Sequence, residues 1–166
     1  MKVLVAYLSQ TGNTRKVAEA IYGEIEADKD LEELGEVESL EGYDLAFVGF
    51  PIHAGNPAAD AKAFLEANAA GKKVAVFVTH AALEGTENAQ RYLDSCRVAV
   101  TGADLVGMFD CQGEMAQAIV DFLAKSDNPR HQEAAARAPE TNGQPDESRL
   151  EKARAFAREV MEKAGW

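Results

Sequence analysis

The chain opens with the apolar run Lys2-Val3-Leu4-Val5-Ala6-Tyr7-Leu8, followed directly by the polar stretch Ser9-Gln10-Thr11-Gly12-Asn13-Thr14. The first run is short and rich in β-formers, so it predicts a buried strand. Beyond the polar stretch, apolar residues recur at helical spacing, as Val17, Ala18, Ala20, Ile21 and Ile25. A strand that enters a helix through a polar turn makes an anion site, because the first helical N–H groups lack partners and the helix dipole favours negative charge there.

The polar stretch also supplies side-chain donors for such an anion. Ser9, Thr11 and Thr14 offer hydroxyls, Asn13 offers an amide, and Gly12 lets the backbone turn tightly and approach a ligand closely. Neither G-x-x-x-x-G-K-[ST] nor G-x-G-x-x-G occurs in the chain, so neutral donors are expected to hold the anion, as suits a bound phosphate monoester. The alternative is an ordinary turn whose polar residues only cap the helix.

Strands and helices are predicted to alternate along the chain. We expect strands near residues 2–8, 35–40, 44–50, 73–79 and 104–110, and helices near 13–27, 58–70, 86–98, 114–125 and 148–164. This alternation predicts an α/β fold with a parallel sheet covered by helices on both faces. The runs 44–50 and 73–79 are almost continuously apolar, as buried strands require, whereas Glu36 and Glu38 place the second strand at a sheet edge.

Length and composition indicate one domain spanning residues 1–166, because a chain of this length that is 46% hydrophobic can form one sizeable core. Residues 126–147 differ from the remainder, with three prolines, an Asn142-Gly143 pair and few large apolar side chains. They predict a polar loop insert before the last helix, with one helical turn near Glu133–Arg137.

The opening strand, together with the stretch Ser9–Thr14, resembles the signature of the flavodoxin family, whose corresponding loop wraps the phosphate of FMN. The resemblance covers most of residues 1–125. It implies a flavodoxin-like, doubly wound sheet of five parallel strands in the order 2-1-3-4-5. It also implies that FMN is the cofactor and sits at the carboxyl ends of the strands.

Two further loops are expected at this edge of the sheet. One follows the third strand and reads Pro51-Ile52-His53-Ala54-Gly55-Asn56-Pro57; the other follows the fourth strand and reads Thr79-His80-Ala81-Ala82-Leu83-Glu84-Gly85. The resemblance places the first loop against the inner part of the flavin ring, facing its N5, and the second at the pyrimidine edge. Residues 51–56, 79–82 and Gly85 are therefore candidate cofactor contacts.

Gly55 has a specific redox interpretation. A carbonyl of Ala54 or Gly55 that swings towards a protonated N5 would stabilise the half-reduced flavin, and glycine tolerates the positive φ that this movement needs. The alternative is a plain turn glycine.

The same loops contain no aromatic residue besides His53 and His80, whereas many flavodoxins sandwich the ring between Trp and Tyr. Weaker FMN binding or a more open ring face is therefore expected. A protonated histidine at either position would favour the reduced, anionic flavin and make its potential pH-dependent. Otherwise each histidine is a loop residue that faces water.

Cys111 and Gln112 close the fifth strand and are expected at the same edge. Gln112 is a candidate partner for a flavin carbonyl, or else it caps the following helix. Cys111 is a candidate redox thiol, or else a packing residue at a strand end. Both are included among the candidate cofactor contacts.

The chain is strongly acidic, with a net charge of −11. Ten acidic residues and a single lysine lie between Glu24 and Asp44. This charge disfavours nucleic-acid binding, because a polyanion would be repelled. It suits docking of redox partner proteins with basic faces, or else it forms a solvated surface that aids solubility.

The sequence shows no metal-ligand spacing, no signal peptide and no apolar run long enough to span a bilayer. Two cysteines make a poor disulfide framework. We therefore expect a cytoplasmic protein without a membrane partner, present as a monomer or weak dimer.

Three functions are compatible with these residues. The first is an FMN-binding, low-potential electron carrier, which needs no catalytic residues because the flavin supplies the chemistry. The second is a flavin-dependent NAD(P)H or quinone-type reductase on the same fold, with the insert as its lid. The third is a phosphatase, since Ser9 and Arg15 stand at the C-x5-R spacing of the low-molecular-weight tyrosine phosphatases, although serine would replace the cysteine nucleophile. The residues favour the carrier.

Overall fold

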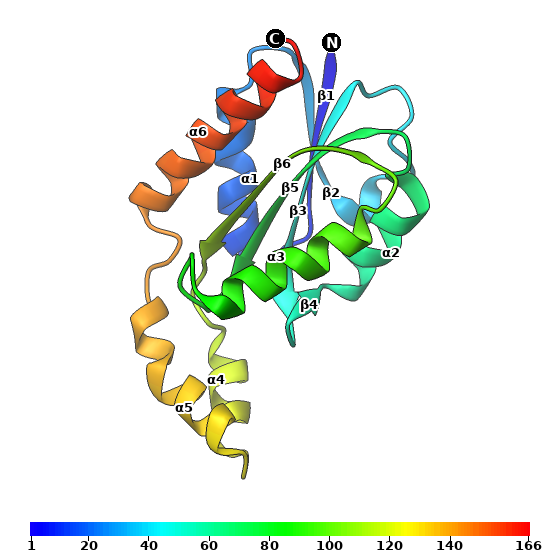
Figure 1. Cartoon of the computed structure of the whole chain (residues 1–166). Coiled ribbons are helices and arrows are strands. Elements are labelled where there is room, and N and C mark those ends of the chain that lie inside the picture. The colour runs from blue at the N-terminus through cyan, green and yellow to red at the C-terminus, as the bar shows by residue number, and fades with distance from the viewer.

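The computed structural model describes residues 1–166 and contains a parallel sheet with helices on both faces (Figure 1). The sheet strands are β1 (Lys2–Tyr7), β2 (Asp28–Glu33), β3 (Leu45–His53), β5 (Lys73–His80) and β6 (Asp104–Gln112). They lie in the order β2-β1-β3-β5-β6, and β4 (Asn56–Pro57) pairs antiparallel with β3 outside this path. With the two-residue β4 set aside, this is the predicted order 2-1-3-4-5, so the fold prediction is confirmed.

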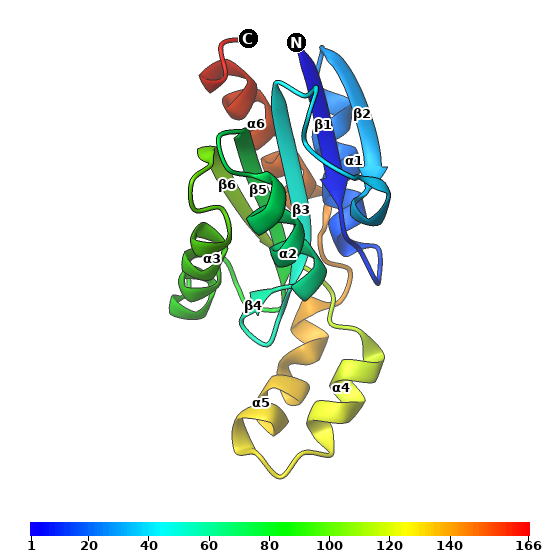
Figure 2. The ribbon, with the colours of Figure 1, turned by 90° about the vertical axis from the view of Figure 1, so that its right-hand side faces the viewer.

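Helices α1 (Asn13–Glu24) and α6 (Glu147–Lys163) cover one face of the sheet, and α2 (Ala59–Asn68) and α3 (Glu87–Ala99) cover the other (Figure 2). Two further helices, α4 (Gln117–Ala124) and α5 (Pro129–Arg137), form a hairpin below the carboxyl edge of the sheet. Both chain termini lie at the opposite end of the molecule. The layers therefore leave the carboxyl edge free for the loops that carry the candidate site.

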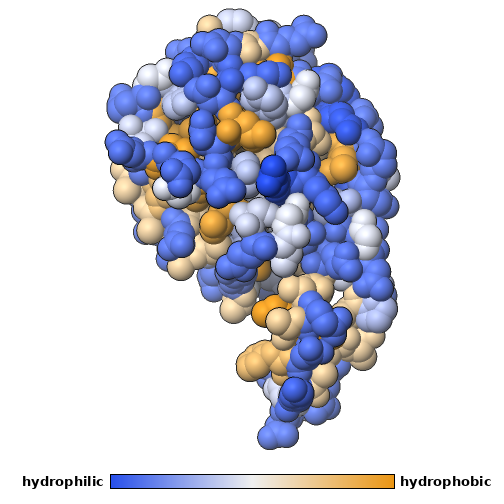
Figure 3. Space-filling view, turned by 180° about the vertical axis from the view of Figure 1, so that it is seen from behind, coloured by the Kyte–Doolittle hydropathy of each residue, from blue (hydrophilic) through white to orange (hydrophobic).

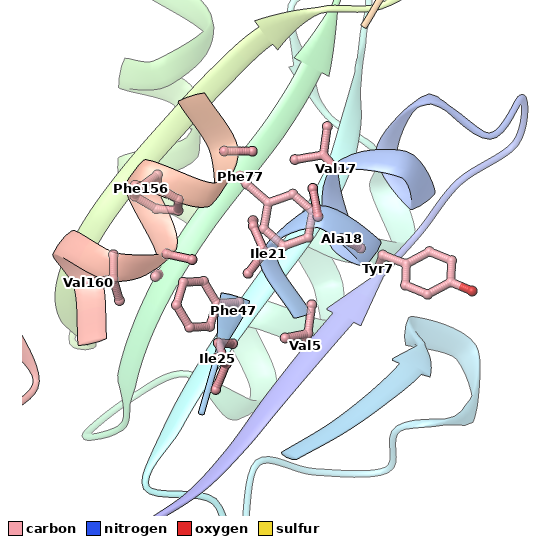
Figure 4. Packing of buried hydrophobic residues seen from close by; sticks show 14 of the residues in the cluster. Val5, Tyr7, Val17, Ala18, Ile21, Ile25, Phe47, Phe77, Phe156 and Val160 are labelled. Atoms are coloured by element: carbon pink, nitrogen blue, oxygen red, sulfur yellow. The ribbon is translucent and has the colours of Figure 1, made fainter. Parts of the chain in front are cut away.

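The protein has two hydrophobic cores, one on each face of the sheet. Successive side chains of each central strand pack alternately into one core and the other, because they point to opposite faces. Val5, Phe47 and Phe77 pack under α1 and α6, where Phe156 meets Phe47 edge-on at a centroid distance of 6.0 Å (Figure 4). The other core lies under α2 and α3 and is lined from the sheet by the set Leu4, Ala46, Val48, Phe50, Val74, Val76 and Val78.

Gly49 on β3 lies directly beneath the Phe77 ring of β5. A Cβ atom at Gly49 would sit 1.9 Å from Cε2 of Phe77, well inside contact distance. A glycine in a central strand normally costs stability, but here its missing side chain makes room for an aromatic ring. The pair fixes the packing at the middle of the sheet.

The prediction of a second strand at 35–40 was wrong. The strand is β2 at Asp28–Glu33, and the predicted segment contains part of a short 3₁₀ helix, η1 (Leu34–Glu36), and then a loop. Leu34, just before the predicted segment, and Leu40, at its end, are buried in the core beneath α2 and α3. β2 itself is polar because it forms the edge, where only one neighbour and little burial are required.

The prediction of a polar loop at 126–147 was also wrong for its first half. That region contains all of α5, followed by the 3₁₀ helix η2 (Ala138–Thr141), whereas one helical turn was expected. Asn128 caps α5 by accepting a hydrogen bond from the N–H of Arg130, and Pro129 occupies the first turn. Proline there has the φ that a helix needs and no N–H to leave unpaired, so it starts the helix rather than marking a loop.

Candidate functional site

A cavity of about 380 Å³ lies at the carboxyl edge of the sheet, where the loops after β1, β3 and β5 meet. Its volume falls in the range of roughly 300–1,000 Å³ that small-molecule sites occupy. All three predicted loops contribute to it, and the predicted residues that line it are Ser9, Gln10, Thr11, Asn13, Thr14, Pro51, Ile52, His53, Ala54, Thr79, His80 and Ala81.

One end of the cavity is the start of α1. Gly12 precedes the helix with φ 92°, no side chain caps it, and no acidic residue stands in its first turn. The first backbone N–H of this region with a helical partner is that of Lys16, bonded to the Gly12 carbonyl at 3.1 Å. The N–H groups of Asn13, Thr14 and Arg15 are therefore available, and with the helix dipole they favour an anion.

Some polar side chains of this loop bond to other parts of the protein, and others stay free to bond a ligand. Thr14 is buried and its Oγ1 lies 2.9 Å from Oγ1 of Thr79, while the Asn13 amide donates to the Glu114 carbonyl at 2.9 Å. These two side chains tie the loop to β5 and to the segment after β6. Thr11 lines the cavity and stays exposed, so its hydroxyl is available to a ligand.

The loop after β3 is a tight hairpin into β4, with Ala54 at φ 49° and Gly55 at φ 82°. The turn therefore requires positive φ at both central positions. Asn56 donates to the Ala54 carbonyl at 3.3 Å, and Oγ of Ser95 donates to the Gly55 carbonyl at 3.3 Å. Both carbonyls considered for a swing towards a flavin thus already have donors in this structure.

His80 is buried, with its side chain 1% exposed. Its Nε2 lies 2.8 Å from Oδ2 of Asp110, its ring rests at a tilt on Tyr92, and its Nδ1 has no partner. The interpretation of His80 as a loop residue facing water is therefore wrong. His53 is exposed at the cavity rim, so that interpretation stands for it alone.

A fourth segment lines the cavity and was missed at the sequence level. It follows β6 and enters α4, and its lining residues are Gly113, Glu114, Met115, Ala116 and Ile119. Its side chains Met115 and Ile119 add apolar surface to a cavity whose other loops supply no Trp or Tyr. The rule that ligands sit beyond the carboxyl ends of parallel strands had already placed Cys111 and Gln112 at this edge, and following the chain past Gln112 would have found the segment.

Seven predicted residues lie outside the cavity lining: Gly12, Gly55, Asn56, Ala82, Gly85, Cys111 and Gln112. The side chain of Gln112 donates to the Ala81 carbonyl at 2.9 Å, so it positions the loop after β5. Gly85, with φ 77°, makes the turn that leads to α3. Cys111 is buried in the core under α1 and α6.

The loop after β5 is anchored by a charged network. Glu84 accepts hydrogen bonds from the Arg149 guanidinium, with Nη2 to Oε2 at 2.9 Å, and from the N–H of Gln112 at 3.1 Å. Burial alone would raise the pKa of Glu84, but bonds from Arg149 and from backbone N–H groups lower the pKa to about 2. The network links this loop to α6 and to the end of β6.

Replacing Glu84 by Gln should destabilise the protein at neutral pH by about 1–2 kcal/mol. This is less than the pKa shift alone would imply, because solvent screens the partly exposed pair of Glu84 and Arg149. The folded-state pKa of Glu84 is depressed, so its contribution is complete above the ordinary value of 4.5 and is lost as the pH falls towards 2. Urea unfolding between pH 7 and pH 3 should show the two proteins converging in acid. Glu66→Gln, which removes an exposed helical pair, is the control.

Burial raises the pKa of both the Cys96 and Cys111 thiols to about 12. The thiolate is the reactive form, so neither residue should react with iodoacetamide in the native protein at pH 8, and both should react in urea. Mass spectrometry of the alkylated protein measures this. Rapid native labelling of Cys111 would restore the interpretation of a redox thiol.

No group of three or more His, Cys, Asp and Glu side chains in the structure could hold a metal ion. None of the helices combines the length and apolar character needed to cross a membrane.

Comparisons with known proteins agree with this geometry. The flavodoxin domain family matches residues 4–158. The flavodoxin-like domain-containing protein BilS of Clostridioides difficile (strain CD3) is 32% identical over 174 residues, covering 99% of this chain and 98% of the relative.

Solved structures share the fold. Oxidised flavodoxin 2 from Bacillus cereus superposes with a TM-score of 0.65 at 24% identity, covering 98% of this chain and 99% of that one. A flavoprotein from Lactobacillus acidophilus NCFM, solved in complex with FMN, superposes with a TM-score of 0.53 at 25% identity, covering 66% of this chain and 92% of that one. From its sheet order, its carboxyl-edge cavity and the family match over nearly its whole length, this chain belongs to the flavodoxin family.

Proposed function

We propose that the protein binds FMN in the carboxyl-edge cavity and acts as an electron carrier between redox partner proteins. The observation that carries the proposal is the uncapped, acid-free start of α1 at one end of a cavity with apolar walls. A phosphate and a flavin ring need these two environments side by side. The FMN complex of the Lactobacillus flavoprotein supports the choice of cofactor.

The residues fit the phosphate of FMN. The free N–H groups at the start of α1 and the Thr11 hydroxyl would hold it, and Ser9 stabilises the loop by accepting a hydrogen bond from the Gly12 N–H at 3.1 Å. Arg15 does not line the cavity, because it pairs with Glu19 at 2.8 Å on the exposed side of α1. The anion is then held by dipoles and neutral donors. The same placement of Arg15 disfavours the phosphatase alternative.

The residues also fit the flavin ring. Pro51, Ile52, Met115 and Ile119 provide apolar walls that would orient the ring and exclude water. Met115 is fixed in place by a bond from its N–H to Oγ1 of Thr141 at 2.9 Å. When bound, FMN supplies one- and two-electron redox chemistry, and the chain supplies binding and orientation.

The charge distribution supports basic redox partners. Glu32 and Glu33 are exposed at the carboxyl end of β2, next to the strand that leads into the phosphate loop. These charges would attract a basic partner to the same end of the molecule that holds the cofactor. The buried free thiols of Cys96 and Cys111 suit a reducing compartment, so we place the carrier in the cytoplasm.

One observation favours the reductase as a second candidate. A smaller cavity of about 260 Å³ adjoins the first, shares Ala81 and Met115 with it, and includes Tyr92 and Arg137. A small acceptor bound there would lie next to the flavin. Steady-state oxidation of NADPH with a soluble quinone by the FMN-loaded protein would favour the reductase, and the absence of turnover would favour the carrier.

The proposal predicts that added FMN binds with a dissociation constant at or below about 1 µM, or about −8 kcal/mol. Binding should perturb the flavin absorption bands and raise the melting temperature of the protein. Riboflavin, which lacks the phosphate, should bind far more weakly. Unchanged spectra and melting at tens of micromolar FMN would contradict the proposal.

A further inference from the structure

Helices α4 and α5 form a hairpin that projects past the carboxyl edge of the sheet (Figures 1 and 2). α4 packs on α5, and none of its eight residues is buried, although six of the eight are apolar, namely Ala118, Ile119, Val120, Phe122, Leu123 and Ala124. A helix this short is marginal in water without further packing. Because α4 is apolar, exposed and part of a projecting hairpin, we expect another molecule to cover its exposed face.

The exposed face of α4 has two large apolar side chains. Ile119 is 51% exposed and Phe122 is 66% exposed, and a spacing of three residues places them on the same side of the helix. Apolar surface is visible over the hairpin in Figure 3. Ile119 also lines the cavity proposed for FMN, so this face continues directly into the site.

Charge indicates what covers this face. Between Ala116 and Thr141 the hairpin has four acidic and three basic side chains, within a chain whose net charge is −11. A second copy of the chain would bring another large negative charge, and an anionic lipid surface would be repelled in the same way. The complementary occupant is a protein with an apolar groove bordered by basic residues.

We propose that the α4 face formed by Ile119 and Phe122 inserts into an apolar groove of a redox partner protein, whose basic rim meets the exposed acidic residues Glu32 and Glu33 at the same end of the molecule. Helix-in-groove recognition of this kind uses anchors one turn apart. Because Ile119 belongs to both surfaces, docking would bring the partner's redox centre to the mouth of the cofactor cavity. The inference rests on the proposed electron-carrier function.

The test uses the FMN-loaded protein and a basic, FAD-containing NADPH:flavodoxin reductase as the partner probe. NADPH reduces the FAD by two electrons, and the FAD passes them to the FMN. Stopped-flow measurement of FMN reduction should give a bimolecular rate at least tenfold lower for Phe122→Ser than for the unmodified protein. Phe122→Leu should restore the rate to within about threefold, since the anchor stays apolar.

Val98→Ser is the matched control, because Val98 is 68% exposed but lies near the end of α3, outside the hairpin. It should leave the rate unchanged. Reduction by dithionite, which needs no docking, and FMN affinity should be equal in all variants.

Equal rates for Phe122→Ser and Val98→Ser, or no reduction of the unmodified protein by the reductase, would overturn the docking proposal. So would a dimer in sedimentation that Phe122→Ser abolishes, or Phe122-dependent binding to phosphatidylglycerol vesicles. Failure to bind FMN at all would instead overturn the proposed function.

Discussion

Replacing Thr11 by Asp is expected to weaken FMN binding by about 100-fold, or about 3 kcal/mol, because a carboxylate would face the phosphate across a partly screened gap. Thr11 lines the cavity at the start of α1, where no acidic side chain is present in the first turn. The same carboxylate would interact favourably with the helix dipole, so the cofactor-free protein should gain roughly 0.3–1 kcal/mol of stability. The variant thus separates binding from folding.

Two controls make this result specific. Thr11→Asn introduces a side chain of nearly the same shape as Asp but without the charge, so it should retain most of the FMN affinity. Riboflavin binding should change little in Thr11→Asp, because the charge acts on the phosphate. Fluorescence titration and thermal melting measure both quantities, and equal FMN affinity in the Asp and Asn variants would show that the phosphate lies elsewhere.

Gly49→Ala should be the most destabilising small substitution in the sheet, by about 3 kcal/mol, since the added methyl would overlap the Phe77 ring and force the strands or the ring to move. The expected Cβ position lies 1.9 Å from Phe77 Cε2, a separation that rotamer adjustment cannot relieve without displacing the core under α1. Urea unfolding monitored by circular dichroism measures the loss.

A double-mutant comparison identifies the cause. Phe77→Leu alone should also destabilise, but the pair Gly49→Ala with Phe77→Leu should lose less than the sum of the two single changes. Gly23→Ala in α1, where an added Cβ meets nothing within 4 Å, should instead stabilise the protein by about 0.5–1 kcal/mol. Additive losses in the double mutant would show that the Gly49 effect does not arise from Phe77.

The central strands and the phosphate loop were predictable because their signals are local. The run Lys2–Tyr7 is apolar on both faces, and the polar stretch after it marks a strand-to-helix turn. Sheet order came from the family resemblance, since periodicity alone does not order strands. The second strand was misplaced because an edge strand such as Asp28–Glu33 needs little apolar character, so its polar sequence does not mark it as a strand.

The cavity wall formed by Met115 and Ile119 was less accessible to sequence reasoning. Their position depends on the hairpin of α4 and α5, and the hairpin depends on Asn128 and Pro129 starting a helix where prolines suggested a loop. His80 presented a similar difficulty. Its burial follows from contacts with Asp110 and Tyr92, which lie 30 and 12 positions away and become neighbours only in the folded sheet.

The base of the hairpin also has a consequence for how this chain can change over evolution. The segment that leads into α4 and the segment that follows η2 meet there, where the Glu114 N–H donates to the Gln144 carbonyl at 2.9 Å. A segment whose two ends are already joined can be lengthened, shortened or exchanged at a small cost in loop-closure entropy, because the scaffold on either side need not move. The α4–α5 hairpin can therefore be exchanged as a unit. Proteins that share this sheet could acquire new binding partners through it, while the phosphate loop stays unchanged.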